Sequence, residues 1–314
     1  MRVLCVIEVT EEEKTLISSS VADYEYIFDT DPSQELLESA DIILGCPKAP
    51  MLRTCEKLQW LQTQSAGVDP YIANLPAGVK LTNATGGYGL AIGEHMMGMY
   101  LSIIKKLAFY RDLQNEHKWG DLGPVTSVYG STVLVVGMGD IGTEFAKICK
   151  GMGTYVIGVR RSNNAPSVYA DEVHLTAELD ELLPKADCVA VCMPGTKETF
   201  KMFGKEKFGK MKDTAVFINI GRGSIVNQPE LVDALNNGVI AGAALDVTDP
   251  EPLPAEDPLW SAKNVVITPH VSGGFHLDET KRRILNICCE NLKNFADGKD
   301  LKNIVDFETG YRKL

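Results

Sequence analysis

Three ionisable side chains are candidates for joint chemistry, because each comes shortly after an apolar run typical of a β-strand. Arg222 lies between two glycines, Glu251 lies in a proline-rich turn, and His270 follows Thr-Pro. An imidazole beside a carboxylate can donate or accept a proton, since histidine ordinarily changes charge near neutral pH. A guanidinium can hold a carboxylate or a carbonyl oxygen through its planar fork of N–H groups. The set therefore suits proton transfer to a small anionic substrate.

Each of the three residues also has an ordinary explanation. Arg222 would fit a solvated turn, Glu251 a surface loop, and His270 a hydrogen-bonded histidine beneath a helix. Their common position after strands favours the functional interpretation. The carboxyl ends of parallel strands meet at one edge of a sheet, and ligands of open α/β sheets bind there. We therefore expect the three side chains to converge at one edge, beside a cofactor.

A glycine-rich loop supplies the expected cofactor site. Gly137, Gly139 and Gly142 form the pattern G-x-G-x-x-G directly after a β-branched apolar run, and a helical pattern follows. The first glycine allows a tight turn, the second lets the backbone approach a pyrophosphate, and the third lets the helix pack on the strand. With Asp140 and Ile141, which complete the loop, these residues are predicted to bind a dinucleotide at the helix N-terminus. The alternative is a glycine-rich turn of some other α/β protein.

The end of the next predicted strand indicates which dinucleotide binds. Sites that prefer NAD usually place Asp or Glu there, where the carboxylate binds the ribose hydroxyls. This chain has Arg160, Arg161 and Ser162 instead. A carboxylate would repel a 2′-phosphate, whereas two guanidinium groups and a hydroxyl would bind it. The sequence therefore predicts NADP(H) as the preferred cofactor and NAD(H) as a second option, although a solvated basic turn would have the same residues.

The chain alternates short apolar runs with helical patterns, which is typical of α/β proteins. Strands are predicted in a first set at residues 2–7, 24–28, 41–44, 57–62 and 79–83, and in a second set at residues 132–136, 154–159, 187–192, 214–218, 240–245 and 264–267. Six strands are the usual number in a doubly wound nucleotide-binding sheet. We therefore predict an α/β protein with two Rossmann-like, doubly wound parallel-sheet domains. One helix is predicted to begin after Asn227, with Glu230 completing a capping box.

Two long helical patterns indicate how the domains connect. Residues 91–104 are apolar on more than one face, which indicates a buried helix. Residues 277–295 form an amphipathic helix after the last strand, and we expect it to return to the first domain. The dinucleotide-binding domain, residues 99–285, would then be inserted in a substrate domain formed by residues 1–98 and 286–314.

The composition fits a globular protein with a substantial core. The chain has 314 residues, of which 45% are hydrophobic and 23% charged. Its formal net charge of −11 argues against a nucleic-acid partner, because an acidic surface repels phosphate. No segment resembles a membrane span or a signal peptide, so we expect no membrane partner. The eight cysteines lie mostly in apolar runs, and neither they nor the histidines have metal-ligand spacing. We therefore expect a cytoplasmic protein without a metal.

Six motifs in order give the chain a resemblance to a known family. They are S-A-G-V-D at 65–69, the segment 83–95 that ends in Glu-His, the loop 137–142, the turn 219–223, and the segments 245–252 and 268–273. With these motifs the sequence resembles the D-2-hydroxyacid dehydrogenases, which include glyoxylate/hydroxypyruvate reductases and phosphoglycerate dehydrogenase. The resemblance extends over essentially the whole chain. It implies hydride transfer between NADP(H) or NAD(H) and a 2-keto or 2-hydroxy acid.

The resemblance also implies roles for the three ionisable residues. In the family, the arginine of the G-R-G turn, the glutamate of the E-P turn and the histidine of P-H are catalytic, and they match Arg222, Glu251 and His270. Reduction of a 2-keto acid needs a hydride on the carbonyl carbon and a proton on the oxygen. We expect His270 to donate that proton, Glu251 to orient the ring and favour its charged form, and Arg222 to bind the substrate and polarise its carbonyl.

The same resemblance suggests substrate contacts in the first domain. The loop residues Ala66, Gly67 and Val68 match backbone N–H groups that bind the substrate carboxylate in the family. Tyr88 and Lys48 are further candidates to face the substrate. A packed tyrosine and a surface lysine would explain these last two equally well.

Matching positions in the second domain suggest contacts with the cofactor and with a second subunit. Asp246 matches an aspartate near the nicotinamide, and Pro194 and Thr196 match a turn that lines the cofactor. Trp119 matches a tryptophan that reaches across a dimer in relatives. Because exposed tryptophans favour interfaces, we expect a homodimer and count Trp119 among the substrate-site residues.

Three other functions are weighed against 2-keto acid reduction. A formate dehydrogenase has glutamine where this chain has Glu251, so the glutamate argues against that function. A non-catalytic NAD(P)-sensing protein on the same fold need not keep all three ionisable residues. A phosphoglycerate dehydrogenase is disfavoured because no regulatory extension is expected and the substrate loop has no arginine cluster.

Overall fold

The computed structural model describes residues 1–308, and these form two compact units. The first unit contains Met1–Tyr88 and the described residues from Phe275 onward, and the second contains Gly89–Gly274. In sequence order the second unit is therefore inserted in the first. The predicted boundaries, after residues 98 and 285, lie inside two helices, whereas the division in the structure precedes both helices.

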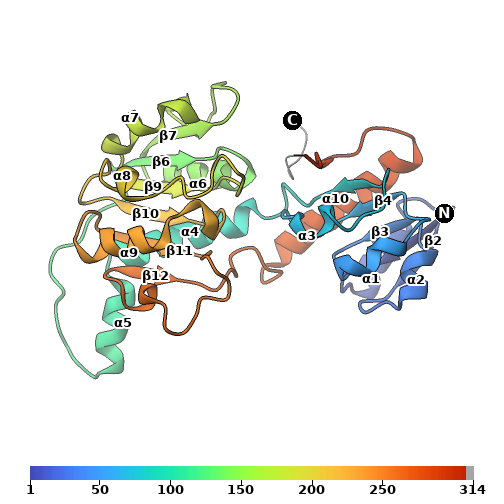
Figure 1. Cartoon of the computed structure of the whole chain (residues 1–314), viewed down its shortest axis with the longest axis horizontal. Coiled ribbons are helices and arrows are strands. Elements are labelled where there is room, and N and C mark those ends of the chain that lie inside the picture. The colour runs from blue at the N-terminus through green and yellow to red at the C-terminus, as the bar shows by residue number, and fades with distance from the viewer. Residues whose placement is uncertain (309–314) are drawn as a thin grey trace. The chain divides into compact units, whose positions relative to one another are not determined.

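The first unit is built on a parallel five-stranded sheet (Figure 1). Its strands are β1 (Arg2–Cys5), β2 (Glu25–Phe28), β3 (Ile42–Leu44), β4 (Trp60–Gln62) and β5 (Lys80–Thr82), in the spatial order β2-β1-β3-β4-β5. Its helices are α1 (Glu11–Ser18), α2 (Gln34–Ser39), the 3-10 helix η1 (Ala49–Thr54), α3 (Asp69–Ile72) and α10 (Asp278–Ala296). All five strands of the first predicted set are confirmed, each slightly shorter than predicted.

Helix α10 belongs to the first unit, and it completes the core of that unit. It packs on α1, and Phe295 near its C-terminal end stacks on Trp60 of β4 with ring centroids 5.3 Å apart. After α10 the chain pairs with β5 through an antiparallel bridge between Ile304 and Thr82. The central strands β3 and β4 are fully buried, as expected of a parallel sheet that is covered on both faces.

The second unit is built on a parallel seven-stranded sheet. Its strands are β6 (Thr132–Val136), β7 (Tyr155–Arg160), β8 (Glu172–Leu175), β9 (Cys188–Val191), β10 (Val216–Asn219), β11 (Gly242–Leu245) and β12 (Val265–Ile267), in the spatial order β12-β11-β10-β9-β6-β7-β8. Its α-helices are α4 (Gly89–Ile104), α5 (Leu107–Asn115), α6 (Asp140–Gly151), α7 (Leu179–Leu182), α8 (Lys205–Phe208) and α9 (Gln228–Asn236). Its 3-10 helices are η2 (Thr176–Glu178), η3 (Leu183–Lys185), η4 (Gly223–Ile225) and η5 (Pro258–Ser261).

The predicted six strands of this sheet are confirmed, but a seventh, β8, was missed at the edge. Strand β6 lies between β7 and β9, so the strand order reverses at β6. In a doubly wound sheet this reversal opens a crevice beyond the carboxyl ends of the two central strands. The glycine-rich loop follows β6 and therefore lies at this point.

Two helices of the second unit pack closely because glycines lie between them. The helix predicted from residue 91 is confirmed as α4, which contacts α6 along its length and also contacts β10, β11 and β12. A Cβ atom at Gly93 would lie 3.3 Å from the backbone nitrogen of Phe145 in α6. The absence of a side chain at Gly93 therefore sets the distance between the two helices.

The predicted start of α9 is confirmed, but the predicted capping box is wrong. The helix begins after Asn227, whose side chain makes no capping hydrogen bond. The Glu230 carboxylate does not reach back to Asn227 either. It accepts the backbone N–H of Lys205 at 2.5 Å, at the start of α8. Glu230 therefore connects α9 to α8 instead of capping the N-terminus of α9.

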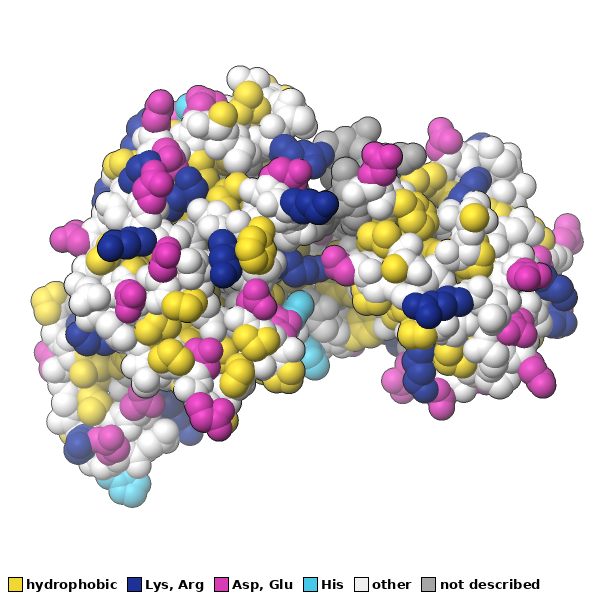
Figure 2. All heavy atoms as spheres, in the orientation of Figure 1, with side chains coloured by type: hydrophobic (Ala, Val, Ile, Leu, Met, Phe, Trp, Pro, Cys, Tyr) yellow, Lys and Arg dark blue, Asp and Glu magenta, His cyan; other side chains and the backbone are white. Residues whose placement is uncertain are grey.

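The surface of each unit carries interspersed acidic and basic side chains on the face shown in Figure 2. No helix in the described part of the chain is long and apolar enough to cross a membrane. All eight cysteines are free thiols, and six of them are buried. Within residues 1–308, no three His, Cys, Asp or Glu side chains gather as a metal site would require.

Candidate active site

The three ionisable residues singled out in the sequence follow three neighbouring strands of the second sheet. Arg222 comes after β10, Glu251 after β11 and His270 after β12, and these strands are parallel and adjacent. Their carboxyl ends therefore meet at one edge of the sheet. The structure thus carries all three segments to the edge at which the glycine-rich loop also lies.

His270 and Glu251 form a hydrogen-bonded pair. Nδ1 of the imidazole lies 2.8 Å from Oε2 of Glu251, and Oε1 of the same carboxylate accepts the backbone N–H of Thr248 at 3.0 Å. The carboxylate is held at both oxygens, so it fixes the orientation of the ring. Among the described residues none forms a hydrogen bond with Nε2 of His270, and the side chain is half exposed. This nitrogen is therefore accessible to a ligand.

A buried amide builds the turn that carries Arg222. Oδ1 of Asn219 accepts the N–H of Gly221 at 3.0 Å, and its Nδ2 donates to the carbonyl oxygen of Arg222 at 3.0 Å. The Arg222 guanidinium also donates to the carbonyl oxygen of Gly221 at 2.8 Å. Both ends of the turn are therefore fixed by one fully buried side chain, which the sequence analysis did not single out.

The glycines on either side of Arg222 are required by close approach of neighbouring loops. A Cβ atom at Gly221 would collide with the carbonyl oxygen of Met193, which follows β9. A Cβ atom at Gly223 would collide with the carbonyl oxygen of Thr248, which follows β11. The segments after β9, β10 and β11 therefore pack edge to edge, and this packing sets where the Arg222 side chain begins.

The loop that carries His270 is held by Asp246, a buried carboxylate at the end of β11. Oδ1 of Asp246 accepts the Thr268 hydroxyl at 2.5 Å and the N–H of Val271 at 3.0 Å. Oδ2 accepts both the N–H and the hydroxyl of Ser272, the former at 3.1 Å. The backbone oxygen of Asp246 accepts the N–H of His270 at 2.8 Å. The carboxylate thus serves the loop, and its predicted contact with a cofactor stays a prediction.

The glycine-rich loop after β6 has the geometry of a dinucleotide site. Gly137 has a φ of +107°, and a Cβ atom there would lie 2.9 Å from the backbone of Cys192 after β9. A Cβ atom at Gly142 would collide with the carbonyl oxygen of Gly137. At Gly139 a Cβ would meet nothing within 4 Å, so this face of the loop is open. Because the first turn of a helix leaves N–H groups unpaired, the open face fits a pyrophosphate.

The other two residues of this loop lie at the start of α6. The Asp140 carboxylate accepts the backbone N–H of Gly89, the first residue of α4, at 3.0 Å. This bond ties the start of α6 to the start of α4. Ile141 is half-buried. The structure therefore gives Asp140 a role in the fold, and the predicted cofactor contacts of both residues stay predictions.

The basic residues after β7 lie on a short loop that is closed on itself. The Arg160 guanidinium donates to Oδ1 of Asn163 and to the carbonyl oxygen of Ala165, both at 3.2 Å. Arg161 and Ser162 are exposed at the same loop. No carboxylate stands at this position of the strand, so the end of the strand itself carries no negative charge that would repel a phosphate.

The turn after β9 is closed by a pair of threonines. The Thr199 hydroxyl donates to the carbonyl oxygen of Pro194 at 2.8 Å and accepts the N–H of Thr196 at 2.7 Å. The N–H of Thr199 in turn donates to the Thr196 hydroxyl at 3.2 Å. Pro194 and Thr196 are therefore parts of one small, ordered turn at the same sheet edge, and Thr199 is a supporting residue that the sequence analysis missed.

In the first unit, the loop 64–67 after β4 has its carbonyl oxygens bound by side chains. The donor and acceptor pairs are Tyr88 to Gln64 at 2.5 Å, Thr63 to Ser65 at 2.9 Å, Asn83 to Ala66 at 2.9 Å and Ser65 to Gly67 at 2.6 Å. The backbone N–H groups of Ala66, Gly67 and Val68 form no hydrogen bond with the described residues. Successive unpaired N–H groups form a concavity that suits an anion.

The two remaining candidates of the first unit differ in their surroundings. Tyr88 is buried, burial raises the pKa of its hydroxyl, and that hydroxyl is bound to the loop. Lys48 is exposed and pairs with Asp31 at 3.3 Å. Tyr88 therefore supports the loop, while contact of either residue with a substrate stays a prediction.

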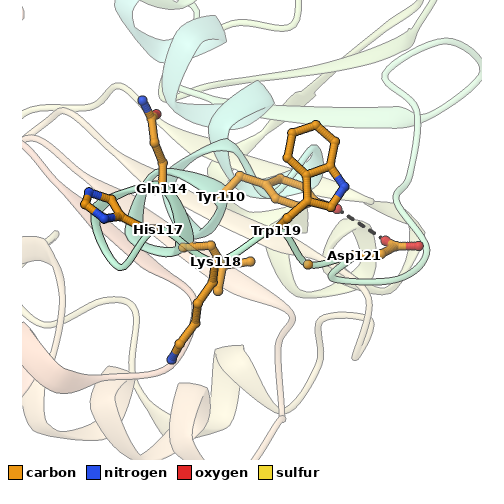
Figure 3. Close-up of a pocket in the computed structure, with 8 residues that line it drawn as sticks. Tyr110, Gln114, His117, Lys118, Trp119 and Asp121 are labelled. Atoms are coloured by element: carbon orange, nitrogen blue, oxygen red, sulfur yellow. Dashed lines mark hydrogen bonds between the residues drawn. The ribbon is translucent and has the colours of Figure 1, made fainter.

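Trp119 lies on an exposed arm of the second unit, formed by α5 and residues 116–127. Its indole is fully exposed and, with Tyr110, lines a pocket of about 600 Å³ (Figure 3). The Tyr110 hydroxyl donates to Asp121 at 3.3 Å and so ties the returning chain to α5. No residue of α5 is buried, so the arm presents aromatic surface that the second unit itself does not cover.

Comparison with known proteins decides the family. The sequence model of the D-isomer specific 2-hydroxyacid dehydrogenase, NAD binding domain, matches residues 97–272, more than half of the chain. The chain belongs to the D-isomer specific 2-hydroxyacid dehydrogenase family. It is therefore an oxidoreductase, and the resemblance of the six motifs is confirmed.

Relatives of this dehydrogenase are similar over most of its length. A glyoxylate reductase of Korarchaeum cryptofilum is 35% identical over 242 residues, which cover 76% of this chain and 70% of the relative. A solved D-isomer specific 2-hydroxyacid dehydrogenase family protein of Aeromonas salmonicida has a TM-score of 0.86 and 30% identity, with 98% and 99% of the chains covered. An NADPH-dependent glyoxylate/hydroxypyruvate reductase of Sinorhizobium meliloti, solved with NADP and sulfate, has a TM-score of 0.82 and 28% identity, with 99% of each chain covered.

The fold of the dehydrogenase family confirms the predicted fold class of two parallel α/β sheets. The residues that sequence reasoning missed are mostly polar supports behind the predicted ones, such as Asn219, Asn83 and Thr199. Two of these lie in motifs that were noted, the turn 219–223 and the segment 83–95. A polar residue at the end of an apolar strand was the available signal, but its partner becomes evident only in three dimensions.

Proposed function

We propose that this dehydrogenase reduces a 2-keto acid to a D-2-hydroxy acid with NADPH. The observation that carries the proposal is the His270–Glu251 pair, 2.8 Å apart, at the sheet edge that also carries the Arg222 turn. An imidazole with one nitrogen fixed by a carboxylate and the other accessible is suited to general acid catalysis. The relatives named glyoxylate reductase and glyoxylate/hydroxypyruvate reductase support this reaction class.

His270 delivers the proton in this mechanism. Glu251 holds Nδ1, so Nε2 is the nitrogen that faces the substrate. The dinucleotide, when bound, supplies a hydride to the carbonyl carbon. As the C–O π electrons move to oxygen, that oxygen takes the proton from Nε2, and the ring is left neutral. Glu251 keeps the ring in place throughout, because its other oxygen is fixed by the N–H of Thr248.

Binding of the substrate is assigned to two groups of donors. Arg222 binds the substrate carboxylate and polarises the carbonyl, since a guanidinium offers parallel N–H donors and a fixed charge. In the first unit, the backbone N–H groups of Ala66, Gly67 and Val68 are assigned to bind a carboxylate. The hydrogen bonds at the carbonyl oxygens of that loop support this assignment, because within residues 1–308 these three N–H groups have no such partner.

The preference for NADPH is assigned to the basic loop after β7. Replacing Arg160 by Asp should lower the ratio of kcat/KM for NADPH to that for NADH by roughly tenfold or more, because it replaces an attraction for the 2′-phosphate by a repulsion. Arg53→Asp, at an exposed arginine of the first unit, serves as the control. An unchanged ratio in Arg160→Asp would remove this assignment while leaving the reaction itself intact.

We also infer that the protein acts as a homodimer through the arm that carries Trp119. The support is the aromatic surface on α5 and residues 116–127, which the second unit leaves uncovered. Light scattering on the purified protein should give the mass of two chains. Trp119→Ser should shift the protein towards the mass of one chain at low concentration. A parent protein with the mass of a single chain would contradict the inference.

Turnover decides between the proposed enzyme and a nucleotide-sensing protein of the same fold. The purified protein should oxidise NADPH in the presence of glyoxylate, hydroxypyruvate or phenylpyruvate, and chiral chromatography should identify a D-2-hydroxy acid as product of the latter two. Glu251→Gln should be severely impaired with every active substrate. Tight NADPH binding without turnover of any 2-keto acid would support a sensor instead and would reject the proposed function.

A further inference from the structure

A histidine outside the catalytic set contacts the loop that carries His270. The Glu-His motif at residues 94–95 was noted in the sequence, but no role followed from it. His95 lies on α4, and its Nε2 is 3.0 Å from the hydroxyl oxygen of Thr268, directly after β12. Only 26% of the His95 side chain is exposed. His95 of this motif therefore connects α4 to the loop that carries His270.

The direction of the hydrogen bonds follows from their partners. The Thr268 hydroxyl lies 2.5 Å from Oδ1 of Asp246, and an ionised carboxylate can only accept. The hydroxyl hydrogen therefore goes to Asp246, and the hydroxyl oxygen accepts an N–H from Nε2 of His95. The direct distance from that Nε2 to Oδ1 of Asp246 is 3.9 Å, too long for a hydrogen bond. Thr268 thus connects the histidine to the carboxylate.

The Asp246 carboxylate holds the loop on both sides of His270. It binds Thr268 before the histidine and the N–H groups of Val271 and Ser272 after it, while the backbone oxygen of Asp246 accepts the N–H of His270. Four of the five residues from 268 to 272 therefore bond to Asp246. A change at the Thr268 hydroxyl would remove one of the two hydrogen bonds to Oδ1, and the N–H of Val271 alone would then hold that oxygen.

The backbone of His270 needs such support. Its φ is +52°, in the left-handed region, which costs a residue with a side chain about 1–2 kcal/mol and persists where the surroundings impose it. The imidazole must also remain within hydrogen-bond distance of Glu251, on a different loop. A small rotation of the loop would separate the pair and move Nε2 from its place.

We propose that His95 is a positioning residue for the proton donor, acting through Thr268 and Asp246 on the loop 268–272. The proposal rests on the proposed function for its kinetic consequence, and on the hydrogen bonds alone for its structural one. In the described part of the chain, the side-chain hydrogen bond of His95 goes to Thr268 and not to His270. His95 supplies the N–H that keeps the Thr268 hydroxyl directed at Asp246, and so keeps His270 in the geometry that proton transfer requires.

Single-turnover kinetics separate positioning from mere stability. The full-length protein, loaded with an equal concentration of NADPH and mixed with saturating glyoxylate, gives a rate constant for the first turnover of NADPH oxidation and an amplitude that counts the molecules completing it. His95→Leu should lower the rate constant by about tenfold or more and leave the amplitude unchanged, because misplacement slows each molecule. His95→Gln, which keeps a side-chain N–H, should recover most of the rate. Loss of amplitude at an unchanged rate constant would overturn the proposal, as would equal rates in the two variants.

Two further comparisons make the test specific. His174→Leu is the matched control, since His174 is a histidine of the same unit with 25% of its side chain exposed, and its rate constant should equal that of the parent. In a double variant, His95→Leu with Thr268→Val should be no slower than the slower single variant, because both changes break one connection. Additive losses would contradict a shared path through Thr268.

Hydrogen–deuterium exchange tests the connection without any turnover. In His95→Leu, the amides of Val271 and Ser272 should exchange faster, while peptides from β6 and β7 should exchange as in the parent. Faster exchange in a protein that reduces no 2-keto acid would sustain the structural connection and reject the proposed function. Unchanged exchange at both amides would reject the connection itself, whatever the activity.

Discussion

The candidate binding groups at the edge of the second sheet differ in kind from those in the loop 64–68 of the first unit. At the edge of the second sheet the candidate groups are side chains, those of Arg222, Glu251 and His270. In the loop of the first unit the candidate groups are backbone N–H groups, with no charged side chain among residues 64–68. The two candidate regions thus rely on two kinds of donor.

The groups that hold these two regions in place also differ in kind. Where side chains act, the backbone is what must be held, and Asp246 does this by accepting N–H groups from the loop of His270. Where the backbone acts, side chains of neighbouring segments hold it, as Asn83 and Tyr88 do by binding carbonyl oxygens. An acidic residue supports the first loop and neutral donors support the second, because the groups they bind are of opposite polarity.

The largest effect is expected where a single side chain does the chemistry. His270→Asn should lower kcat by roughly 10²–10⁴-fold, because it removes the general acid. Asparagine tolerates the left-handed backbone of this position, so the loop should keep its shape. The measurement is kcat with NADPH and the best 2-keto acid, together with the NADPH dissociation constant.

The control for His270→Asn is its binding of NADPH, which should match that of the parent. A kcat within a factor of about three of the parent value would show that another group supplies the proton, since general acids contribute far more than this. That result would contradict the contrast between the two regions, because proton transfer at the second sheet would then not depend on the side chain of His270.

The fold could be predicted well from the sequence because its signals are local. Eleven predicted strands are present, since a buried parallel strand is an apolar run between helical patterns. Strand β8 was missed because it lies at the sheet edge, is half-buried throughout and contains charged residues. Its sequence Glu-Val-His-Leu is short, and its polarity is typical of a loop. The edge of a sheet is therefore where local hydrophobicity is least informative.

The candidate site could be predicted only in part, for the same physical reason. Arg222, Glu251 and His270 could be proposed from the sequence because the chemistry proposed for them resides in the residue type. The supports were not, because a bond such as that from Asn83 to Ala66 joins segments that are distant in sequence. The failed cap at Asn227 is a further example, since Glu230 had a competing partner, Lys205, at the start of another helix. Local motifs predict which groups act and leave open what holds them.

A moderate effect is expected where a neighbouring side chain supports a backbone site. Asn83→Ala removes the N–H donor to the carbonyl oxygen of Ala66 and leaves that oxygen free to turn. We expect the KM for the 2-keto acid to rise about tenfold, about 1.4 kcal/mol, which is within the range for loss of one hydrogen bond. Because the loop binds substrate and transition state alike, kcat should change much less.

Asn74→Ala is the matched control for Asn83→Ala. Asn74 is an asparagine of the same unit whose side chain bonds to Arg53 and Pro70 and not to a residue of the loop 64–68. Its KM for the 2-keto acid and for NADPH should equal the parent values. If Asn83→Ala lowered kcat by as much as it raised KM, the loop 64–68 would contribute to the transition state. The contrast between a loop that only binds substrate and side chains that catalyse would then be wrong.

The smallest effect is expected at a histidine that, like His270, is hydrogen-bonded to glutamate but has no accessible ring nitrogen. His174 at the end of β8 lies 2.8 Å from Glu178 through Nδ1 and 2.7 Å from Glu172 through Nε2, so both ring nitrogens are engaged. These hydrogen bonds from Glu178 and Glu172 raise the pKa of His174 above 6.5. His174→Leu should therefore leave kcat unchanged and affect stability alone.

The pH dependence of that stability follows from the direction of the shift. A histidine whose pKa is higher in the folded than in the unfolded state stabilises the fold fully below the unfolded value, and the stabilisation is lost as pH rises through the folded value. The Tm of the parent should exceed that of His174→Leu by about 1–3 °C near pH 6, and by less near pH 9. The carboxylates remain charged at both pH values, because the bonds from His174 to Glu178, and from Tyr155 and His174 to Glu172, lower their pKa. An equal Tm difference at the two pH values would mean that His174 stabilises the fold by packing, and the resemblance to the His270–Glu251 pair would be one of geometry only.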